Sequence, residues 1–253
     1  MKTSYQSRLA VMAASISAAL LVSACQPTPE EVAPAEVVAT ETTATDTSTQ
    51  AAATDAHSGH DMTNMDMTPA EGTPMTEMLK DYTASMTSMN VEMMKGMNYN
   101  DPDTAFAQGM LGHHIGAVDM AKIELKYGKD EEMRKLAQQI IDAQQSEITT
   151  MQTWLASHPD AAEPTADTKA MQQAYAEGMD AMHSEMMAGI ADPVADMAFV
   201  RGMLPHHIGA VDMAEVELKY GKDAEMRKLA QQVIDAQKAE IKQMQNWIAN
   251  NKA

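Results

Sequence analysis

The sequence predicts an all-α protein made of one helical unit that occurs twice. Three observations support this prediction: apolar residues recur three and four positions apart, no stretch alternates regularly between apolar and polar residues, and the chain matches itself at an offset of 93 residues. At that offset, residues 109–157 and 202–250 are identical at 37 of 49 positions. Six helices in two units of about 80 residues therefore imply a helix bundle.

The helices of the first unit can be placed from their end signals. The apolar spacing predicts a helix over Met75–Met97, and Asp101-Pro102 supplies a cap and a first-turn proline for a second helix that ends at Tyr127. We expect Gly128 to close that helix in the left-handed conformation. A third helix follows the cap at Asp130.

The third helix carries one largely apolar stripe, and its members are Met133, Ala137, Ile140, Gln144, Glu147, Met151 and Trp154. The second unit repeats the three helices from about Thr168 to Asn250, after an Ala-Glu-Pro linker at Ala161–Pro164. We therefore assign the two helical repeats to residues 75–158 and 168–251.

The first 25 residues are typical of an export signal. Lys2 and Arg8 precede an apolar run that is too short to cross a bilayer, and the run ends in Leu21-Val22-Ser23-Ala24-Cys25. This ending resembles a bacterial lipobox, so we expect a lipoprotein anchored to a membrane through Cys25. Gln26 rather than Asp follows the cysteine, which by resemblance to enteric sorting rules favours a periplasm-facing lipoprotein of the outer membrane. The alternative is an ordinary signal peptide with an incidental cysteine.

Composition restricts the partners of the chain. It has 18 Lys or Arg residues against 36 Asp or Glu, a formal net charge of -18, and phosphate binding needs clustered basic residues. Nucleic acid is therefore excluded as an expected partner. The single cysteine cannot form an internal disulfide, whereas 26 methionines provide many thioethers.

Residues 26–74 predict a flexible linker, because they contain too few large apolar side chains to offset the entropy lost on ordering. One segment of this linker is rich in imidazole and thioether side chains, which are suitable ligands for Cu(I) or Ag(I). We expect it to capture metal through His57, His60, Met62, Met65 and Met67. The alternative is a polar linker with incidental methionines.

Each repeat contains a His-His doublet flanked by methionines. On a helix these four residues project within one broad face, so two sulfurs and two nitrogens could meet at one axis of the bundle. The predicted metal ligands are Met110, His113, His114 and Met120 in the first repeat and Met203, His206, His207 and Met213 in the second.

A carboxylate and a thioether lie one turn apart on each third helix, as Glu147 with Met151 and as Glu240 with Met244. We include all four among the candidate metal ligands, because a buried carboxylate must find a partner or stay protonated. The alternative is that Glu147 accepts a hydrogen bond from His113 and only orients it.

Methionine is also unusually frequent on the first helix of each repeat. Between Met75 and Met97 there are seven methionines against one leucine and one valine, although leucine packs with better-defined rotamers. We predict a metal-binding role for part of these stripes, with core packing as the alternative. The candidates are Met86, Met89, Met93, Met179, Met182 and Met186. Histidine must be neutral to ligate, so histidine contacts should weaken below about pH 6 while thioether contacts persist.

Two copies of Gly-Met-Leu-x-His-His-Ile-Gly-Ala-Val-Asp-Met-Ala occur, each followed by Leu-Ala-Gln-Gln-x-Ile-Asp-Ala-Gln and then by Glu-Ile-x-x-Met-Gln-x-Trp. Over roughly residues 75–250 these motifs resemble the domain of unknown function 305 family. The resemblance implies a ferritin-like helical fold, copper binding and a role in copper resistance. It assigns the copper ligands to the two sets of doublet residues given above.

We therefore expect an exported protein that sequesters Cu(I), or hands it to a copper-transfer protein, without catalytic turnover. Cu(II) and Ag(I) are further candidate ions. A ferritin-like di-metal oxidase is one alternative, but such sites need Glu-x-x-His motifs, and Met110 and Met203 stand three residues before His113 and His206. The other alternative is a structural envelope module whose methionines only pack.

Overall fold

The computed structural model describes residues 75–251, which form six α-helices and contain no strand. The predicted all-α fold is thus confirmed for this range, whereas the predicted export signal, Cys25 and the His/Met-rich linker segment lie outside it. The helices are α1 (Glu77–Met97), α2 (Pro102–Tyr127), α3 (Glu131–Leu155), α4 (Thr168–Ile190), α5 (Ala195–Tyr220) and α6 (Ala224–Asn250). Within the described range, no helix has the length and apolarity that a membrane crossing requires.

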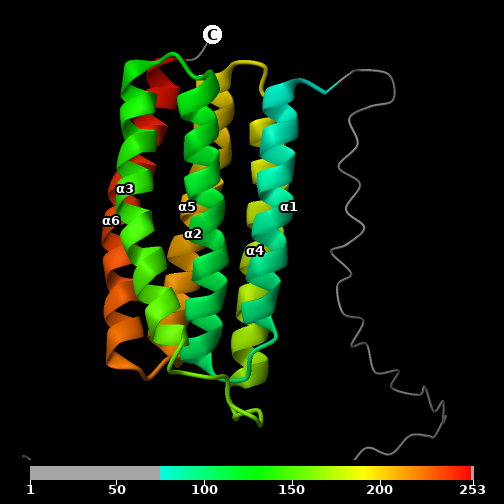
Figure 1. The fold of residues 1–253 in the computed structure, drawn as a ribbon, viewed down its shortest axis with the longest axis vertical. Coiled ribbons are helices and arrows are strands. Elements are labelled where there is room, and N and C mark those ends of the chain that lie inside the picture. The colour runs from blue at the N-terminus through cyan, green and yellow to red at the C-terminus, as the bar shows by residue number, and fades with distance from the viewer. Residues whose placement is uncertain (1–74, 252–253) are drawn as a thin grey trace, which may run out of the picture. The chain divides into compact units, whose positions relative to one another are not determined.

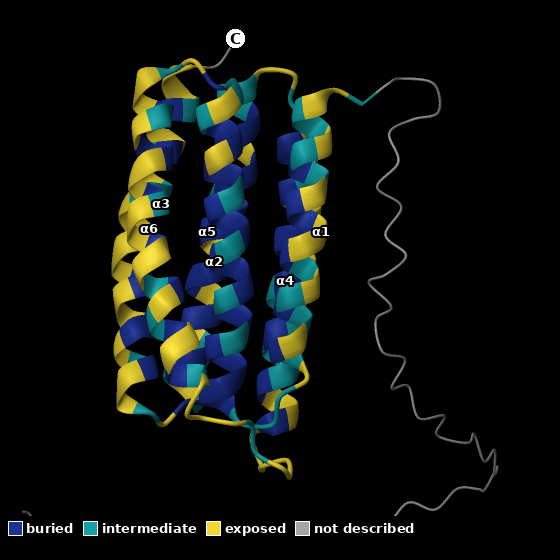
Figure 2. Ribbon diagram, in the orientation of Figure 1, coloured by how far each residue is buried: buried dark blue, intermediate teal, exposed yellow. Residues whose placement is uncertain are grey.

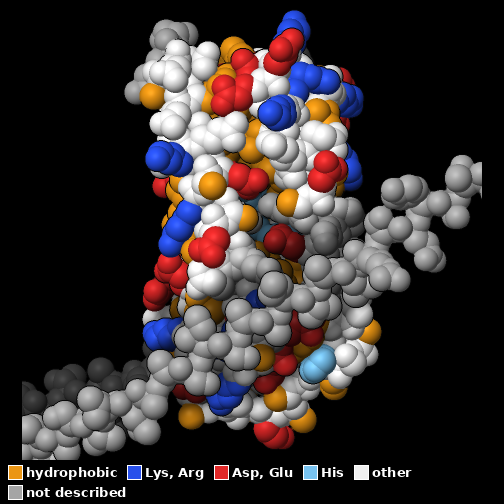
Figure 3. Space-filling view, turned by 90° about the vertical axis from the view of Figure 1, so that its left-hand side faces the viewer, with side chains coloured by type: hydrophobic (Ala, Val, Ile, Leu, Met, Phe, Trp, Pro, Cys, Tyr) orange, Lys and Arg blue, Asp and Glu red, His pale blue; other side chains and the backbone are white. Residues whose placement is uncertain are grey.

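The six helices form one bundle with α2 and α5 at its centre (Figure 1). Helix α2 packs against α1, α3 and α5, and α5 packs against α4 and α6, so the two repeats meet along their central helices. Burial follows this arrangement, because α2 and α5 are largely buried whereas α3 and α6 expose their outer faces (Figure 2). On the visible part of the α3/α6 side, acidic and basic side chains are interspersed (Figure 3).

The helix starts confirm the predicted caps. The Asp101 side chain accepts a hydrogen bond from the Thr104 backbone N–H at 3.0 Å, and the Asp130 side chain accepts one from the Met133 N–H at 3.0 Å. Each carboxylate therefore satisfies a backbone donor that the first helical turn leaves free.

The expected conformation of Gly128 was wrong. Its φ is -70° and its ψ is 155°, which is extended rather than left-handed backbone. Glycine is needed there for space, because a Cβ at Gly128 would overlap the buried carboxyl group of Glu124. In the second repeat, a Cβ at Gly221 would likewise overlap the carboxyl group of Glu217.

The two repeats exchange equivalent contacts at the ends of the bundle. Asp196 of α5 accepts hydrogen bonds from the backbone N–H groups of Lys129 and Asp130, both at 2.7 Å. In return, Asp103 of α2 accepts from the N–H groups of Lys222 and Asp223 at 2.9 and 2.8 Å. Since these pairs are related by the 93-residue offset, the repeats pack like the two subunits of a symmetric dimer about an approximate twofold axis.

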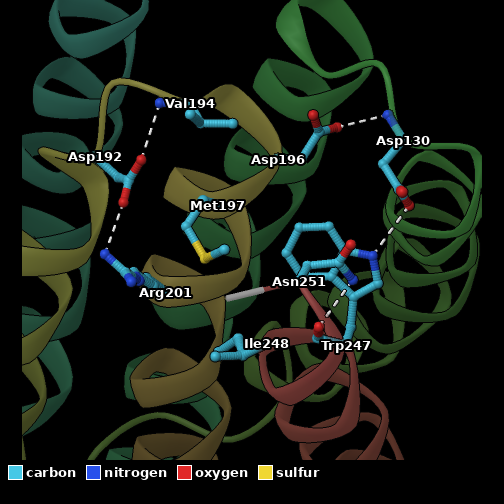
Figure 4. A pocket seen from close by; sticks show the side chains of 9 residues that line it. All are labelled: Asp130, Asp192, Val194, Asp196, Met197, Arg201, Trp247, Ile248 and Asn251. Carbon is cyan, nitrogen blue, oxygen red and sulfur yellow. Dashed lines mark hydrogen bonds and ion pairs between the residues drawn. The ribbon is translucent and has the colours of Figure 1, made fainter. Parts of the chain in front are cut away.

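Figure 4 shows one of these ends. Besides the bond from the Asp130 N–H to Asp196, the Trp247 indole N–H donates to the Asp130 carboxylate at 3.2 Å, and Arg201 pairs with Asp192 at 2.7 Å. These residues line a surface pocket that includes none of the predicted metal ligands. The contacts therefore hold helices together and lie apart from the histidine doublets.

A buried glutamate lies next to each exchanged aspartate. Burial, with the nearby Asp196 carboxylate, raises the pKa of Glu124 to about 8, and burial with the nearby Asp103 carboxylate raises the pKa of Glu217 to about 9. Neither glutamate side chain is exposed, and their carboxyl oxygens have no hydrogen-bond partner among the described residues. Both carboxyl groups are therefore mostly protonated at pH 7 in the folded state.

We predict that these two glutamates make the folded protein less stable as the pH rises. Each pKa is raised above the ordinary value of 4.5, so the contribution to stability is complete below pH 4.5 and is lost as the pH rises towards about 8 or 9. The replacements Glu124→Gln and Glu217→Gln should each remove a slope of about 1.4 kcal/mol per pH unit from the free energy of unfolding. Denaturant titrations between pH 5 and 9 measure this slope, and an unchanged slope in the double variant would contradict the assignment.

Candidate metal centre

The two histidine doublets meet at the centre of the bundle. His113 and His114 come from α2, His206 and His207 come from α5, and all four side chains are fully buried. The rings of His113 and His206 lie with their centroids 3.6 Å apart and their planes tilted by 43°. Because residues 113 and 206 are equivalent in the two repeats, this contact lies on the approximate twofold axis.

The outer histidine of each doublet is held by a glutamate from the following helix. His114 Nε2 lies 2.7 Å from Glu147 Oε2, and His207 Nε2 lies 2.7 Å from Glu240 Oε2. Glu147 thus contacts His114 rather than His113, which was its expected partner in the orienting alternative. The glutamate side chains are 23% and 22% exposed, so each pair connects the buried doublet with solvent.

These bonds leave several imidazole nitrogens without partners. A carboxylate on Nε2 fixes the proton there, so the Nδ1 lone pairs of His114 and His207 remain free, and both atoms are buried without a partner among the described residues. His206 Nε2 lies 3.1 Å from the His113 backbone oxygen, which likewise leaves His206 Nδ1 unpartnered, and neither ring nitrogen of His113 has a partner. Five buried nitrogens are thus unpaired, although one unsatisfied buried polar group costs about 1–3 kcal/mol.

The central histidines are held in the neutral form. Burial, reinforced by the neighbouring histidines, lowers the pKa of His113 and of His206 well below the ordinary value of 6.5. Neutral imidazole is the form that binds metal ions. The expected loss of histidine ligation below about pH 6 therefore moves to lower pH for these two residues.

The methionines around the doublets are buried with them. Met110 and Met203, one turn before the inner histidines, have no exposed surface. Met120 and Met213 point across the interface between the repeats: a Cβ on Gly202 would lie 2.9 Å from the Met120 methyl carbon, and a Cβ on Gly109 would lie 3.1 Å from that of Met213. The contact region of α2 and α5 therefore contains both imidazoles and thioethers.

Two further thioethers reach this region from the outer helices. A Cβ on Gly116 would lie 2.6 Å from Met89 Sδ, and a Cβ on Gly209 would lie 2.5 Å from Met182 Sδ. Gly116 follows His113 by three residues and therefore lies one helical turn away on the same side of α2. The absence of a side chain at these glycines lets each sulfur approach the backbone beside an inner histidine.

The remaining described candidates are also core residues. Met86, Met93, Met179, Met186, Met151 and Met244 are each at most 4% exposed. Among residues 75–251, no three His, Cys, Asp or Glu side chains lie close enough together to hold an ion by themselves. Their sulfur atoms are thus buried soft donors within the core.

One buried histidine lies outside the predicted set of metal ligands. His183 of α4 is 5% exposed and lies against Asn90 of α1, with 3.3 Å between His183 Nδ1 and Asn90 Nδ2. The 93-residue offset places His183 opposite Asn90 between equivalent methionines, so no repeated histidine marks this position in the sequence.

The motifs that surround the doublets occur in a known protein family. The profile described as "Domain of unknown function (DUF305)" matches residues 103–248. The chain belongs to the DUF305 family. The resemblance seen in the sequence is therefore confirmed, and a search of curated proteins gives no significant match.

Solved structures similar to this DUF305 chain include CopM and a bacterial relative. CopM in the Cu(I)-bound form is 33% identical, with a TM-score of 0.45 over 60% of this chain and 98% of that chain. CopM in the Ag-bound form, obtained by soaking, is 32% identical, with a TM-score of 0.46 over 60% and 97%. A putative secreted DUF305 protein from Streptomyces coelicolor is 27% identical, with a TM-score of 0.48 over 61% and 94%.

We predict that Gly116→Ala destabilises the protein by about 1–3 kcal/mol, because the new Cβ would overlap the Met89 thioether in a packed core. Gly178→Ala in α4 is the matched control, since its Cβ would meet only Asp212 Cβ at 3.9 Å. That variant should instead gain about 0.5–1 kcal/mol from reduced backbone entropy of the unfolded state. Urea unfolding of both variants measures the difference, and equal stabilities would show that Met89 does not occupy the space at Gly116.

Proposed function

We propose that this DUF305 protein binds Cu(I), and Ag(I) as a similar ion, at the doublet region between α2 and α5. The observation that carries the proposal is the set of five unpartnered imidazole nitrogens in a fully buried region lined by thioethers. Neutral nitrogen and thioether donors together suit a soft monovalent ion.

Glu147 and Glu240 support this proposal because they orient two of the histidines. Glu147 and Glu240 contact His114 and His207 through Nε2, so they orient the rings and leave Nδ1 for the ion. We therefore assign the two carboxylates to positioning rather than to ligation. This differs from the sequence analysis, which counted them as candidate ligands.

The similar proteins agree with the choice of ion. CopM, which is 32–33% identical over nearly its whole length, is described in Cu(I)-bound, Cu(II)-bound and Ag-bound forms. We extend copper and silver binding to this chain on its own donor set. Cu(II) is a weaker candidate here, because methionine sulfur prefers the monovalent state.

The cellular role follows from the same chemistry. We propose that the protein sequesters copper in the cell envelope, or delivers it to a transfer protein, and thereby contributes to copper resistance. The export signal and Cys25 would supply the membrane anchor, and the segment from His57 to Met67 would capture further ions. No catalytic step is part of this proposal.

We predict that the double variant His113→Leu, His206→Leu lowers the affinity for Cu(I) by roughly tenfold or more, an effect of about 1.4 kcal/mol. Leucine fills a similar volume and removes unpartnered nitrogens, so folding should be retained. Competition of the purified mature protein with a chromophoric Cu(I) chelator measures the affinity, and circular dichroism checks the fold. His158→Leu, at an exposed position after α3, is the matched control and should not change binding.

The result that would reject the central site is equal competition by the wild type and the double variant. In that case the methionine stripes or the linker would hold the copper. If neither protein competes with micromolar chelator, copper binding itself is rejected, and the methionines only pack.

We also predict that Glu147→Gln and Glu240→Gln together weaken Cu(I) binding by roughly 10–100-fold, because ligand orientation depends on the carboxylate partner. The number of bound ions should stay the same, since the donors remain. A chelator competition that shows unchanged affinity, or a lost equivalent of copper, would contradict the positioning role.

A further inference from the structure

A second cluster of soft donors lies between α1 and α4, on the side of the bundle away from α3 and α6 (Figure 1). The two helices run antiparallel: Gln172 near the start of α4 donates to the Tyr99 backbone oxygen just after α1, whereas Asn90 and His183 meet midway along both helices. Because Asn90 and His183 are equivalent under the 93-residue offset, the approximate twofold axis also passes between them.

Four buried methionines flank this polar pair along the two helices in a symmetric pattern. Met179 and Met186 lie four residues before and three residues after His183, which places them on the same face of α4. Met86 and Met93 have the same spacing from Asn90 on α1. All four methionine side chains are nearly or completely buried.

His183 is prepared to act as a ligand in this setting. Burial lowers its pKa from the ordinary value, and the nearby Asp180 carboxylate only partly opposes that shift. The ring lies against the Asn90 amide, whose oxygen is buried and has no partner among the described residues. If the amide turns its oxygen towards Nδ1–H, that oxygen gains a partner and the Nε2 lone pair of His183 becomes free.

We propose that His183 Nε2 and thioethers of Met86, Met93, Met179 and Met186 form a second binding site for Cu(I) or Ag(I). This site uses one imidazole where the centre of the bundle uses four. The first repeat has Asn90 at the equivalent position, so the duplicated protein has a single mixed nitrogen and sulfur site here rather than a pair. It does not depend on ion binding at the doublets, because it shares none of their histidines.

Silver titration of the full mature protein with 15N-labelled histidine tests the proposal. Ag(I) is diamagnetic, and coordination moves the ring nitrogen signal of the bound imidazole in long-range 1H–15N spectra. We expect the Nε2 signal of His183 to shift in the wild type and in the variant His113→Leu, His206→Leu. If the His183 signal does not move at silver saturation, the site does not exist, whatever happens at the doublets.

Stoichiometry supplies the second readout. His183→Asn reproduces the residue of the first repeat, so the fold should persist, and the protein should bind one silver equivalent fewer while the doublet signals still respond. Replacing Met86, Met93, Met179 and Met186 with leucine should abolish the His183 shift. Unchanged stoichiometry in His183→Asn, or a persistent His183 shift in the leucine variant, would overturn the proposed site.

Discussion

The contact between α2 and α5 governs the rest of the structure. It brings two neutral imidazoles, His113 and His206, to a ring separation of 3.6 Å where no solvent reaches them. Two protonated rings could not occupy this position, because desolvation and their mutual repulsion both oppose the charge. Each repeat therefore buries its His-His doublet against the copy of itself, within the hydrophobic core.

Small residues bring α1 close to the central helix α2. Gly96 and Gly109 bring the α1 and α2 backbones together, and a Cβ on Gly112 would lie 2.7 Å from the Met93 backbone nitrogen. Unbranched methionine side chains can follow such a narrow interface and fill irregular space, which branched aliphatic side chains do less well. The second repeat departs from this pattern, since Pro205 inside α5 occupies the position of Gly112. The same methionines can therefore fill a narrow helix interface with their unbranched side chains and offer their sulfur atoms as metal ligands.

The helices and several of their ends were predictable because their signals are local. The apolar spacing and the caps at Asp101 and Asp130 depend only on residues within a few helical turns. The internal repeat can be read by aligning the chain with itself. The partner of Glu147 and the space requirement at Gly128 were not predictable, because both depend on which side chains the neighbouring elements present. The exchange between Asp196 and the turn after α2 depends on the antiparallel docking of two repeats, which sequence periodicity does not encode.

The same distinction applies to the candidate metal ligands. The doublets stand out in the sequence because a repeated motif carries them, whereas His183 became visible only when α4 was placed against α1. Its counterpart is Asn90, so a search for repeated histidines passes over it. The sites that sequence could not reveal are those where the two copies differ.

Charge explains why a monovalent ion suits the centre of this bundle. Neutral imidazoles and thioethers contribute no negative charge, so an ion among them carries its full charge into a region of low polarity. Glu147 and Glu240 lie one imidazole away and can compensate a single positive charge through the His114 and His207 rings. Thioether sulfur also favours a monovalent over a divalent ion, and the two carboxylates are engaged with Nε2 and remain partly in solvent. A monovalent ion would instead bind the unpartnered Nδ1 atoms and leave the contacts between the glutamates and Nε2 in place.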